Sequence, residues 1–219
     1  MNLIVRATQI EAFRRLTETE YGTHDDFVRT ISGTVEENEA MRLGTAVHRV
    51  LELYNNTDKH PTAYECSGHI IDGESIANAG SFLTPLWLRE VRATKTVDGS
   101  PYNVTITGAT DVVLGNVIVD HKTTLKAIDD RKIQAYEASM QWRVYLWLFG
   151  ATDFYFNLLQ WREASGVWFL TDREHIHCTA YEGMEADVMS CLLRMLDYCA
   201  EHDLIKHLTK EPSNERTAV

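Results

Sequence analysis

The middle of this chain carries a stretch of β-branched residues that is interrupted by one Gly-Asn pair, a pattern typical of a β-hairpin. The alternation predicts strands over residues 102–107, 111–114 and 117–121. Gly115 and Asn116 are the two residues of the predicted turn, because this dipeptide suits a tight two-residue connection. A chain with such a hairpin must build a sheet around it.

The register of this hairpin brings charged side chains together. If Gly115 and Asn116 form the turn, Asp111 lies directly opposite Asp120 on the neighbouring strand. Lys122 lies two residues beyond Asp120, on the same strand face. Opposed carboxylates repel each other unless a cation lies between them, and such oxygen ligands suit Mg²⁺ or Mn²⁺. A solvated hairpin with an ordinary Lys–Asp pair is the alternative, and the geometry alone leaves both open.

Segments with helical and strand periodicity surround the hairpin. A first short helix is predicted to begin with Thr8 as its cap and Glu11 three residues later. Residues 55–80 are polar and contain several glycines, which indicates connections around one short helix. Further helices are predicted over about 36–54, 133–149 and 181–207, and strands over about 154–161 and 167–171.

Length and composition indicate a globular chain. With 219 residues, of which 44% are hydrophobic, we expect one domain over 1–219, with a core over about 8–207 and a polar tail over 208–219. No apolar run approaches the ~18 residues that span a bilayer, so we expect a soluble, cytoplasmic protein without a membrane partner. The net charge of −11 excludes a broadly basic surface, so any contact with nucleic acid must be local.

Two of the predicted helices carry pairs of residues four positions apart, which places both members of a pair on one helix face. Gly44 and His48 form the first pair, and Gln141 and Tyr145 form the second. Each pair alone has an ordinary explanation. A histidine at the edge of a helix is usually hydrogen-bonded rather than a metal ligand, and a polar seam on a buried helix is often structural.

Taken in order, these pieces resemble the RecB-type branch of the PD-(D/E)XK nuclease superfamily. They are Gly44-x-x-x-His48, Gly108-x-x-Asp111, Asp120-x-Lys122 followed by Thr123, and Gln141-x-x-x-Tyr145. The resemblance covers residues 8–145, and four short motifs in the right order are more specific than any one of them. It implies a restriction-endonuclease-like α/β fold with a central mixed sheet of about five strands and helices on both faces.

The resemblance also implies roles for the charged residues of the hairpin. His48, Asp111, Asp120 and the backbone carbonyl of His121 would hold a Mg²⁺ or Mn²⁺ ion. Lys122 would position or deprotonate the attacking water and stabilise the charge that develops on the phosphate. Much of the superfamily has Glu where this chain has Asp120, and either carboxylate can serve as the ligand.

Three further residues enter through the same resemblance. Gln141 and Tyr145 would complete the pocket and orient Lys122 or the substrate backbone. Glu90 resembles the variable acid of the first strand.

The four cysteines do not match the pattern of the iron–sulfur members, so we expect no iron–sulfur cluster. The sequence also contains no GxxxxGK[ST] loop, the motif of a helicase motor.

Other groups of residues have less specific patterns. Glu174, His175, His177 and Cys178 resemble metal ligands, but without a second pair at a zinc-like spacing they indicate a polar strand end. The alternating aromatic residues over 154–169 are more often core than a surface on which bases stack. The basic residues nearest the motifs are candidate DNA contacts: Arg42, Arg49, Lys126, Arg131, Lys132 and Arg143.

The predicted function is metal-dependent hydrolysis of DNA phosphodiester bonds, and the resemblance implies an exonuclease of recombination, repair or phage DNA metabolism. DNA is the expected partner, with a separate recombination or single-strand-binding protein as a further one. Two alternatives stay open. One is a nuclease fold that serves as a non-catalytic DNA-binding or protein-interaction module, and the other is a metal-dependent RNA hydrolase or phosphatase.

Overall fold

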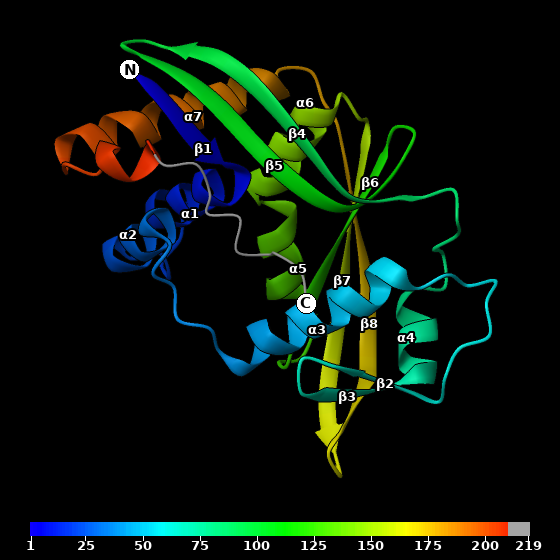
Figure 1. Cartoon of the computed structure of the whole chain (residues 1–219). Helices are drawn as coiled ribbons and strands as arrows, with labels where there is room; N and C mark the ends of the chain where they lie inside the picture. The colour runs from blue at the N-terminus through cyan, green and yellow to red at the C-terminus, as the bar shows by residue number, and fades with distance from the viewer. Residues whose placement is uncertain (210–219) are drawn as a thin grey trace.

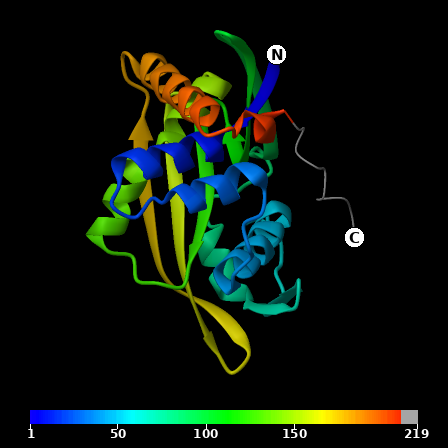
Figure 2. The same cartoon turned by 90° about the vertical axis from the view of Figure 1, so that its left-hand side faces the viewer.

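A computed structural model describes residues 1–209, and these residues form a mixed α/β fold (Figure 1). A twisted sheet runs through the centre of the molecule, and helices cover both of its faces (Figure 2). The predicted fold class is therefore confirmed. The predicted number of strands is wrong, because the sheet of the described residues has eight strands rather than about five.

The strands follow one another in the sheet in the order β1-β5-β6-β7-β8-β3-β2, and β4 pairs with β5. The β1–β5, β6–β7 and β3–β8 pairs are parallel, and the others are antiparallel. The strands are β1 (Asn2–Arg6), β2 (Ala63–Cys66), β3 (His69–Asp72), β4 (Leu88–Gly99), β5 (Tyr102–Leu114), β6 (Val117–Thr124), β7 (Asp153–Ala164) and β8 (Val167–Thr179).

The helices fall into two groups, one on each face of the sheet. A last short 3-10 helix, η1 (Ile205–Leu208), ends in the buried Leu208, so this residue packs with the core rather than beginning the polar tail. Positions 210–219 of the predicted tail lie outside the described residues. The helices are α1 (Ala7–Glu18), α2 (His24–Ser32), α3 (Glu39–Leu53), α4 (Gly73–Ala79), α5 (Asp130–Glu137), α6 (Met140–Phe149) and α7 (Met184–Glu201).

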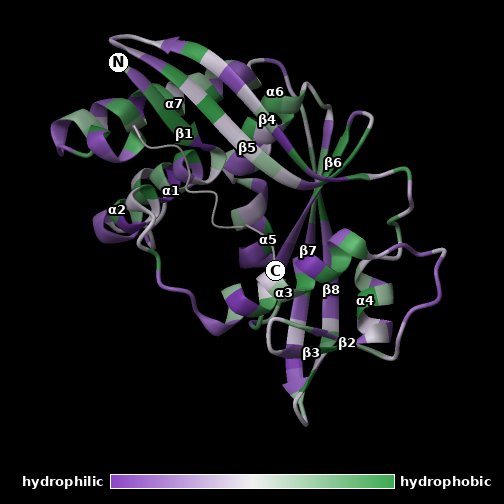
Figure 3. Ribbon diagram, in the orientation of Figure 1, coloured by the Kyte–Doolittle hydropathy of each residue, from purple (hydrophilic) through white to green (hydrophobic). Residues whose placement is uncertain are grey.

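The strands that sequence patterns missed are short or exposed. β1 has only five residues, and β2 and β3 form a small hairpin around a turn at Ser67 and Gly68, both with positive φ. β4 is mostly polar, with a few apolar residues at irregular spacing (Figure 3), and it buries little, so its pattern is weak. The two strands predicted over 102–107 and 111–114 are one continuous strand, β5.

The helix predicted over 133–149 is two helices. α5 ends before Ala138, and Ser139 begins α6 by accepting a hydrogen bond from the backbone N–H of Gln141 at 3.1 Å. The first helix is capped differently from the prediction as well. Arg6 rather than Thr8 precedes it, and the Gln9 side chain accepts a hydrogen bond from the Arg6 backbone N–H at 2.8 Å.

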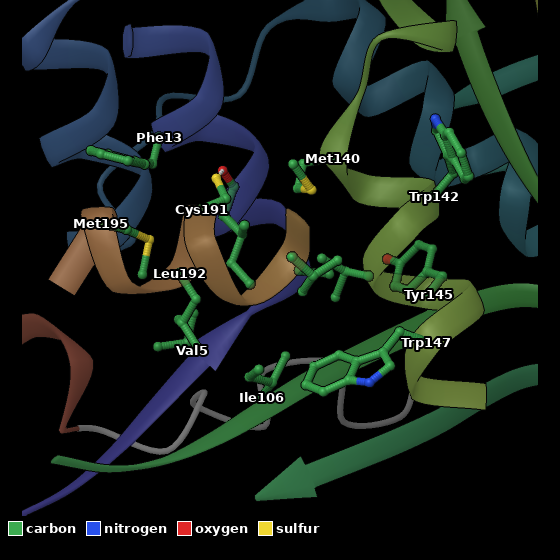
Figure 4. Close-up of a cluster of buried hydrophobic side chains, with 14 of the residues drawn as sticks. Val5, Phe13, Ile106, Met140, Trp142, Tyr145, Trp147, Cys191, Leu192 and Met195 are labelled. Atoms are coloured by element: carbon green, nitrogen blue, oxygen red, sulfur yellow. Dashed lines mark hydrogen bonds between the residues drawn. The ribbon is translucent and has the colours of Figure 1, made fainter. Parts of the chain in front are cut away.

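Two hydrophobic cores lie on the two faces of the sheet. The larger one packs α1, α2, α6 and α7 against β1, β5, β6 and β7, and Figure 4 shows part of it, with Val5, Ile106, Trp147 and Leu192 converging from four elements. The smaller core packs α3 and α4 against the other face. No helix in the described part of the chain is long and apolar enough to cross a membrane.

Candidate active site

The predicted site residues lie where the central strand β5 changes neighbours. The pairing of β1 with β5 ends at Arg6 and Thr107, because α1 begins directly after Arg6. The pairing of β6 with β5 covers only residues 112–114 of β5. Residues 108–111 of β5 lie between these two pairings, while β6 continues beside β7 as far as Thr124. The β5–β6 hairpin thus opens into a fork, and polar side chains line it.

The hairpin turn at Gly115 and Asn116 is confirmed, and the three residue pairs next to the turn have the predicted register. The predicted direct pairing of Asp111 with Asp120 is wrong, because the two strands separate at this point. Asp111 bridges the gap with its side chain instead. Its Oδ2 accepts a hydrogen bond from the backbone N–H of His121 at 2.6 Å, in place of a bond between the two backbones.

Helix α3 brings His48 to the fork. Nδ1 of His48 lies 3.2 Å from Oδ1 of Asp111, although the two residues are 63 positions apart in the sequence. Gly44, one turn earlier on α3, faces the side chain of Thr123. A Cβ added at Gly44 would lie 3.5 Å from the Thr123 Cβ, an ordinary contact, so packing does not require glycine here.

Asp120 and Lys122 lie on one face of β6, as their spacing predicts, and their charged groups touch. Nζ of Lys122 lies 2.6 Å from Oδ2 of Asp120. The contact is an ion pair without the alignment of a hydrogen bond, so Asp120 Oδ2 has no hydrogen-bond partner among the described residues. Asp120 is only 4% exposed, which makes this a buried carboxylate held by a single contact.

Helix α6 closes the fork with Tyr145 and Gln141. Nε2 of Gln141 donates a hydrogen bond to the Tyr145 hydroxyl at 3.3 Å. The Tyr145 ring packs directly over Gly108, where a Cβ would lie 2.6 Å from a ring carbon, so only glycine allows this approach. The charges of Asp120 and Lys122 both act on the Tyr145 hydroxyl. The predicted grouping of these four side chains is thus present.

The ionisable groups of the fork have strongly perturbed pKa values. Burial alone would raise the pKa of Asp111, but the adjacent His48 and the His121 backbone N–H hold it well below its usual range. Burial and the nearby charge of Asp111 raise the pKa of Asp120, in spite of the Lys122 ammonium. Burial lowers the pKa of His121 to about 3. Such concentrated perturbation is typical of functional sites.

The ligands predicted for a divalent ion are present at the fork but are paired with one another. Among the residues that the structure describes, no three His, Cys, Asp or Glu side chains are grouped so that they could hold an ion as they stand. The chemistry of the donors nevertheless fits. A buried carboxylate, Asp120, next to a partly buried one, Asp111, is a combination that a hard divalent cation stabilises.

Glu90 lies on β4, which pairs with β5 on the edge opposite to β6. The β4–β5 pairs on either side of Glu90 place it opposite Asp111, and its φ of 49° is the left-handed conformation, which is strained for a residue other than glycine. Glu90, Asp111 and His48 all line a small cavity of about 10 Å³, roughly the space that one water molecule occupies. The structure thus brings the predicted Glu90 to the fork.

Two further residues line this cavity that the sequence patterns missed. Glu52 lies one helical turn after His48 on α3, a spacing of four that could have indicated it. Arg89 lines the cavity with a guanidinium whose Nη2 donates to the backbone carbonyl of Tyr54 at 3.1 Å. No sequence pattern distinguishes Arg89 from Arg92, the other arginine of β4.

The six basic residues predicted as DNA contacts divide into two sets. Arg42 pairs with Glu39 and Arg49 pairs with Glu52, whereas Arg143 donates to the carbonyls of Ala138 and Ser139, so each of these three has its partner within or beside its own helix. The other three lie in the segment that leaves the fork after β6, in and before α5. They are Lys126, Arg131 and Lys132.

The ligand-like run at the end of β8 contributes no metal group among the described residues. His177 pairs with Asp153 at 2.8 Å, and Cys178 is buried in the larger core. The four cysteines are free, and burial raises the pKa of the Cys178 thiol to about 11. Of the aromatic residues over 154–169, Phe154, Phe156 and Trp161 are buried as predicted, whereas Tyr155 is only partly buried and Phe169 is 37% exposed.

Comparison with solved structures shows which fold this is, whereas no protein-family model and no curated protein matches the sequence. A phage-related exonuclease from Haemophilus somnus 129PT matches over 92% of this chain and 97% of its own, with 12% identity and a TM-score of 0.52. SSO0001 matches with 16% identity over 89% of this chain and 75% of its own, with a TM-score of 0.49. LHK-Exo, solved in complex with dAMP, matches with 13% identity over 90% and 88%, with a TM-score of 0.45. The chain therefore has the fold of the phage-related exonuclease, which agrees with the fold that the sequence motifs implied.

Proposed function

We propose that this chain is a divalent-metal-dependent nuclease that hydrolyses phosphodiester bonds in DNA. The observation that carries the proposal is the convergence of His48, Asp111, Asp120 and Lys122 from three separate elements on one fork of the sheet. Two buried carboxylates near each other oppose folding, and hydrophobic packing does not require them. The shared fold with a phage-related exonuclease supports the same class of reaction.

In the proposed site, Asp111, Asp120, His48 and the carbonyl of His121 would hold the ion, which we expect to be Mg²⁺ or Mn²⁺. When bound, such an ion polarises the phosphate and lowers the pKa of a coordinated water, which makes the phosphorus more electrophilic and the water more nucleophilic. His48 also orients Asp111 through the contact between Nδ1 and Oδ1.

Lys122 would act directly on the reacting groups. Its ammonium lies against Asp120 at the inner end of the fork, where it can hold a water molecule in line with the phosphate and stabilise the negative charge that develops there. The Tyr145 hydroxyl, fixed by Gln141, limits the positions that the ammonium can adopt. Glu90 is a further acid beside Asp111 and would tune the charge of the site.

The DNA backbone would reach the fork along the segment that carries Lys126, Arg131 and Lys132. Nζ of Lys132 lies 2.7 Å from Oγ1 of Thr124, the last residue of β6, so this charge is fixed close to the site. Arg42 and Arg49 would contribute less, because the charge of each is already paired with that of a glutamate. We further propose an exonuclease of recombination, repair or phage DNA metabolism, for which the order of the sequence motifs and the shared fold are the support.

The test is incubation of the purified chain with end-labelled single- and double-stranded linear DNA and with closed circular DNA. Each substrate is offered with Mg²⁺, Mn²⁺ or EDTA, beside the Asp120→Ala variant. We expect metal-dependent loss of the linear substrates that the variant does not show. Binding of DNA without cleavage under any condition would indicate a binding module, and cleavage of RNA or a phosphomonoester alone would indicate a different hydrolase.

A further inference from the structure

An aromatic hollow lies beside the fork, on the face of the sheet that carries α4. The rings of Phe82, Trp87, Tyr155 and His175 form its walls, and its volume is about 190 Å³. Phe82 stands edge-on to both Trp87 and His175, with ring centroids 5.8 and 5.9 Å apart. We call these four residues and the space between them the aromatic pocket.

The aromatic pocket is continuous with the proposed site through His121. The His121 ring lies 5.8 Å from the ring of His48, in the fork, and 6.1 Å from the ring of Phe82, in the pocket wall. Asn157, which lines the pocket, lies with Nδ2 2.9 Å from Nδ1 of His121. A group bound in the pocket therefore lies one side chain away from the residues proposed to act on the phosphate.

The chemistry of the pocket suits an uncharged flat ring. Apart from Asn157 and His175, its lining is apolar or phenolic, and burial together with Arg173 lowers the pKa of His175, so its ring is neutral at neutral pH. An anion would find no positive charge among the lining residues, whereas an aromatic ring could stack on the walls. A phosphate is thus excluded as the occupant.

Asn157 joins the pocket to the hydrogen-bonded groups beside the fork. The side chain is fully buried, and its Nδ2 also donates to the backbone carbonyl of Ala79 at 3.1 Å. Asn157 is thus fixed by the protein, and the surface that the pocket offers to a ligand is that of its aromatic walls.

We propose that the aromatic pocket holds one unstacked nucleobase of the substrate, next to the phosphate that is cleaved. The inference rests on the proposed nuclease function and deepens it, because it assigns a base-binding site to the same catalytic fork. All four DNA bases offer a flat face, so the pocket positions the strand without strict sequence preference.

The test measures binding rather than cleavage, so that it does not depend on a metal. A fluorescently labelled single-stranded oligoadenylate is titrated with the protein in EDTA, by fluorescence anisotropy. We expect Trp87→Leu and Tyr155→Leu to weaken binding about 5- to 100-fold, the range that one stacked base contributes. Phe169→Leu is the matched control, because Phe169 is 37% exposed and does not line the pocket.

A change in the ligand makes the test independent of protein folding. A single abasic residue is moved along the oligonucleotide, and one position should weaken binding to the natural protein but not to Trp87→Leu.

The outcomes separate the two proposals. If the protein cleaves DNA but binds every abasic oligonucleotide as tightly as the intact one, the pocket proposal is overturned and the nuclease proposal stands. The same holds if Trp87→Leu and Phe169→Leu bind alike. If the protein neither binds nor cleaves DNA, the nuclease proposal fails, and the pocket proposal fails with it.

Discussion

Two buried acids, Glu11 and Asp120, lie in contrasting surroundings. Glu11 is 5% exposed and accepts four hydrogen bonds. They come from Arg14 Nε and Nη2, both at 3.0 Å, from Arg15 Nε at 2.9 Å and from the Met140 backbone N–H at 2.7 Å. Burial alone would raise the pKa of Glu11, but the two arginines bring it below its usual value. Glu11 is thus a fully satisfied anion that joins α1 to the start of α6.

Asp120 is as buried as Glu11, but its carboxylate has fewer partners. Its contact with Lys122 is one unaligned ion pair, and the nearby Asp111 carries charge of the same sign. The pKa of Asp120 is raised by burial and by Asp111, the opposite direction from Glu11. Buried polar groups that serve the fold are normally satisfied, so the contrast is the one expected between a structural acid and an acid of the proposed site.

The largest expected effect is on cleavage. Lys122→Ala should lower the rate of DNA cleavage at least about a thousandfold, or ~4 kcal/mol, because it removes the positive charge beside the reacting phosphate. The rate is measured with saturating Mg²⁺ on linear DNA. Lys206→Ala is the control, since Lys206 is exposed and pairs with Asp203 on the last turn. A Lys122→Ala variant that cuts at the natural rate would contradict the proposed mechanism.

Asp120→Asn extends this test to stability. It should lose cleavage as Lys122→Ala does, yet its free energy of unfolding in EDTA should not fall, because the change removes one of two like charges at the fork.

The next effect is on stability. Glu11→Gln should lower the free energy of unfolding by about 3 kcal/mol, because it leaves Arg14 buried beside a neutral partner. Urea denaturation followed by circular dichroism measures this change. Cleavage per folded molecule should stay at the natural level, and a loss of cleavage in folded Glu11→Gln would remove the distinction between the two acids.

The stability contributed by Glu11 should depend on pH. Because the pKa of Glu11 is lowered in the folded state, its contribution is complete above the unfolded value of about 4.3 and is lost as the pH falls through the folded value. The difference in unfolding free energy between the natural protein and Glu11→Gln should therefore shrink between pH 6 and pH 3. A difference that stays constant over this interval would show that the carboxylate charge is not what matters.

The smallest expected effect is on the stability of α6, the helix that contacts Glu11 at its start and carries Gln141 and Tyr145 to the fork. Ser139→Ala removes the cap of α6 and should lower the free energy of unfolding by about 1 kcal/mol. Because Glu11 holds the neighbouring Met140 N–H, the loss in Ser139→Ala and that in Glu11→Gln should not add. A double-mutant cycle in urea measures the coupling, and strict additivity would mean that the two contacts act independently.

Local patterns in the sequence predicted the pieces of the site correctly. The turn at Gly115 and Asn116, the shared face of Asp120 and Lys122, and the shared face of Gln141 and Tyr145 all follow from spacings of two or four residues. Such periodicities are properties of the backbone and need no knowledge of distant residues.

The errors have an equally physical origin. Glu11 looked like half of a capping box. Its spacings of three and four to Arg14 and Arg15 could have indicated pairing along α1, but its contact with the Met140 N–H is known only once α1 packs on α6. The sequence predicted one continuous helix over 133–149, because the apolar repeat runs through the whole segment. A single capping serine, Ser139, is a less distinct signal than this repeat, although it begins a new helix. Exposed β4 and five-residue β1 gain their stability from pairing with β5, a neighbour that their own sequences do not specify.

The sequence by itself determined the fold class and the residues from which the candidate site is built, because four short motifs in one order resemble those of a known nuclease superfamily, and turn chemistry and periodicity assign them to strands and helices. Only the tertiary structure decided that the hairpin opens before Asp111, that His48 reaches Asp111, and that Glu90 lies opposite it. Tertiary structure also placed an aromatic pocket beside the fork. These arrangements depend on which strands and helices pack side by side, and contacts between residues 63 positions apart leave no local pattern.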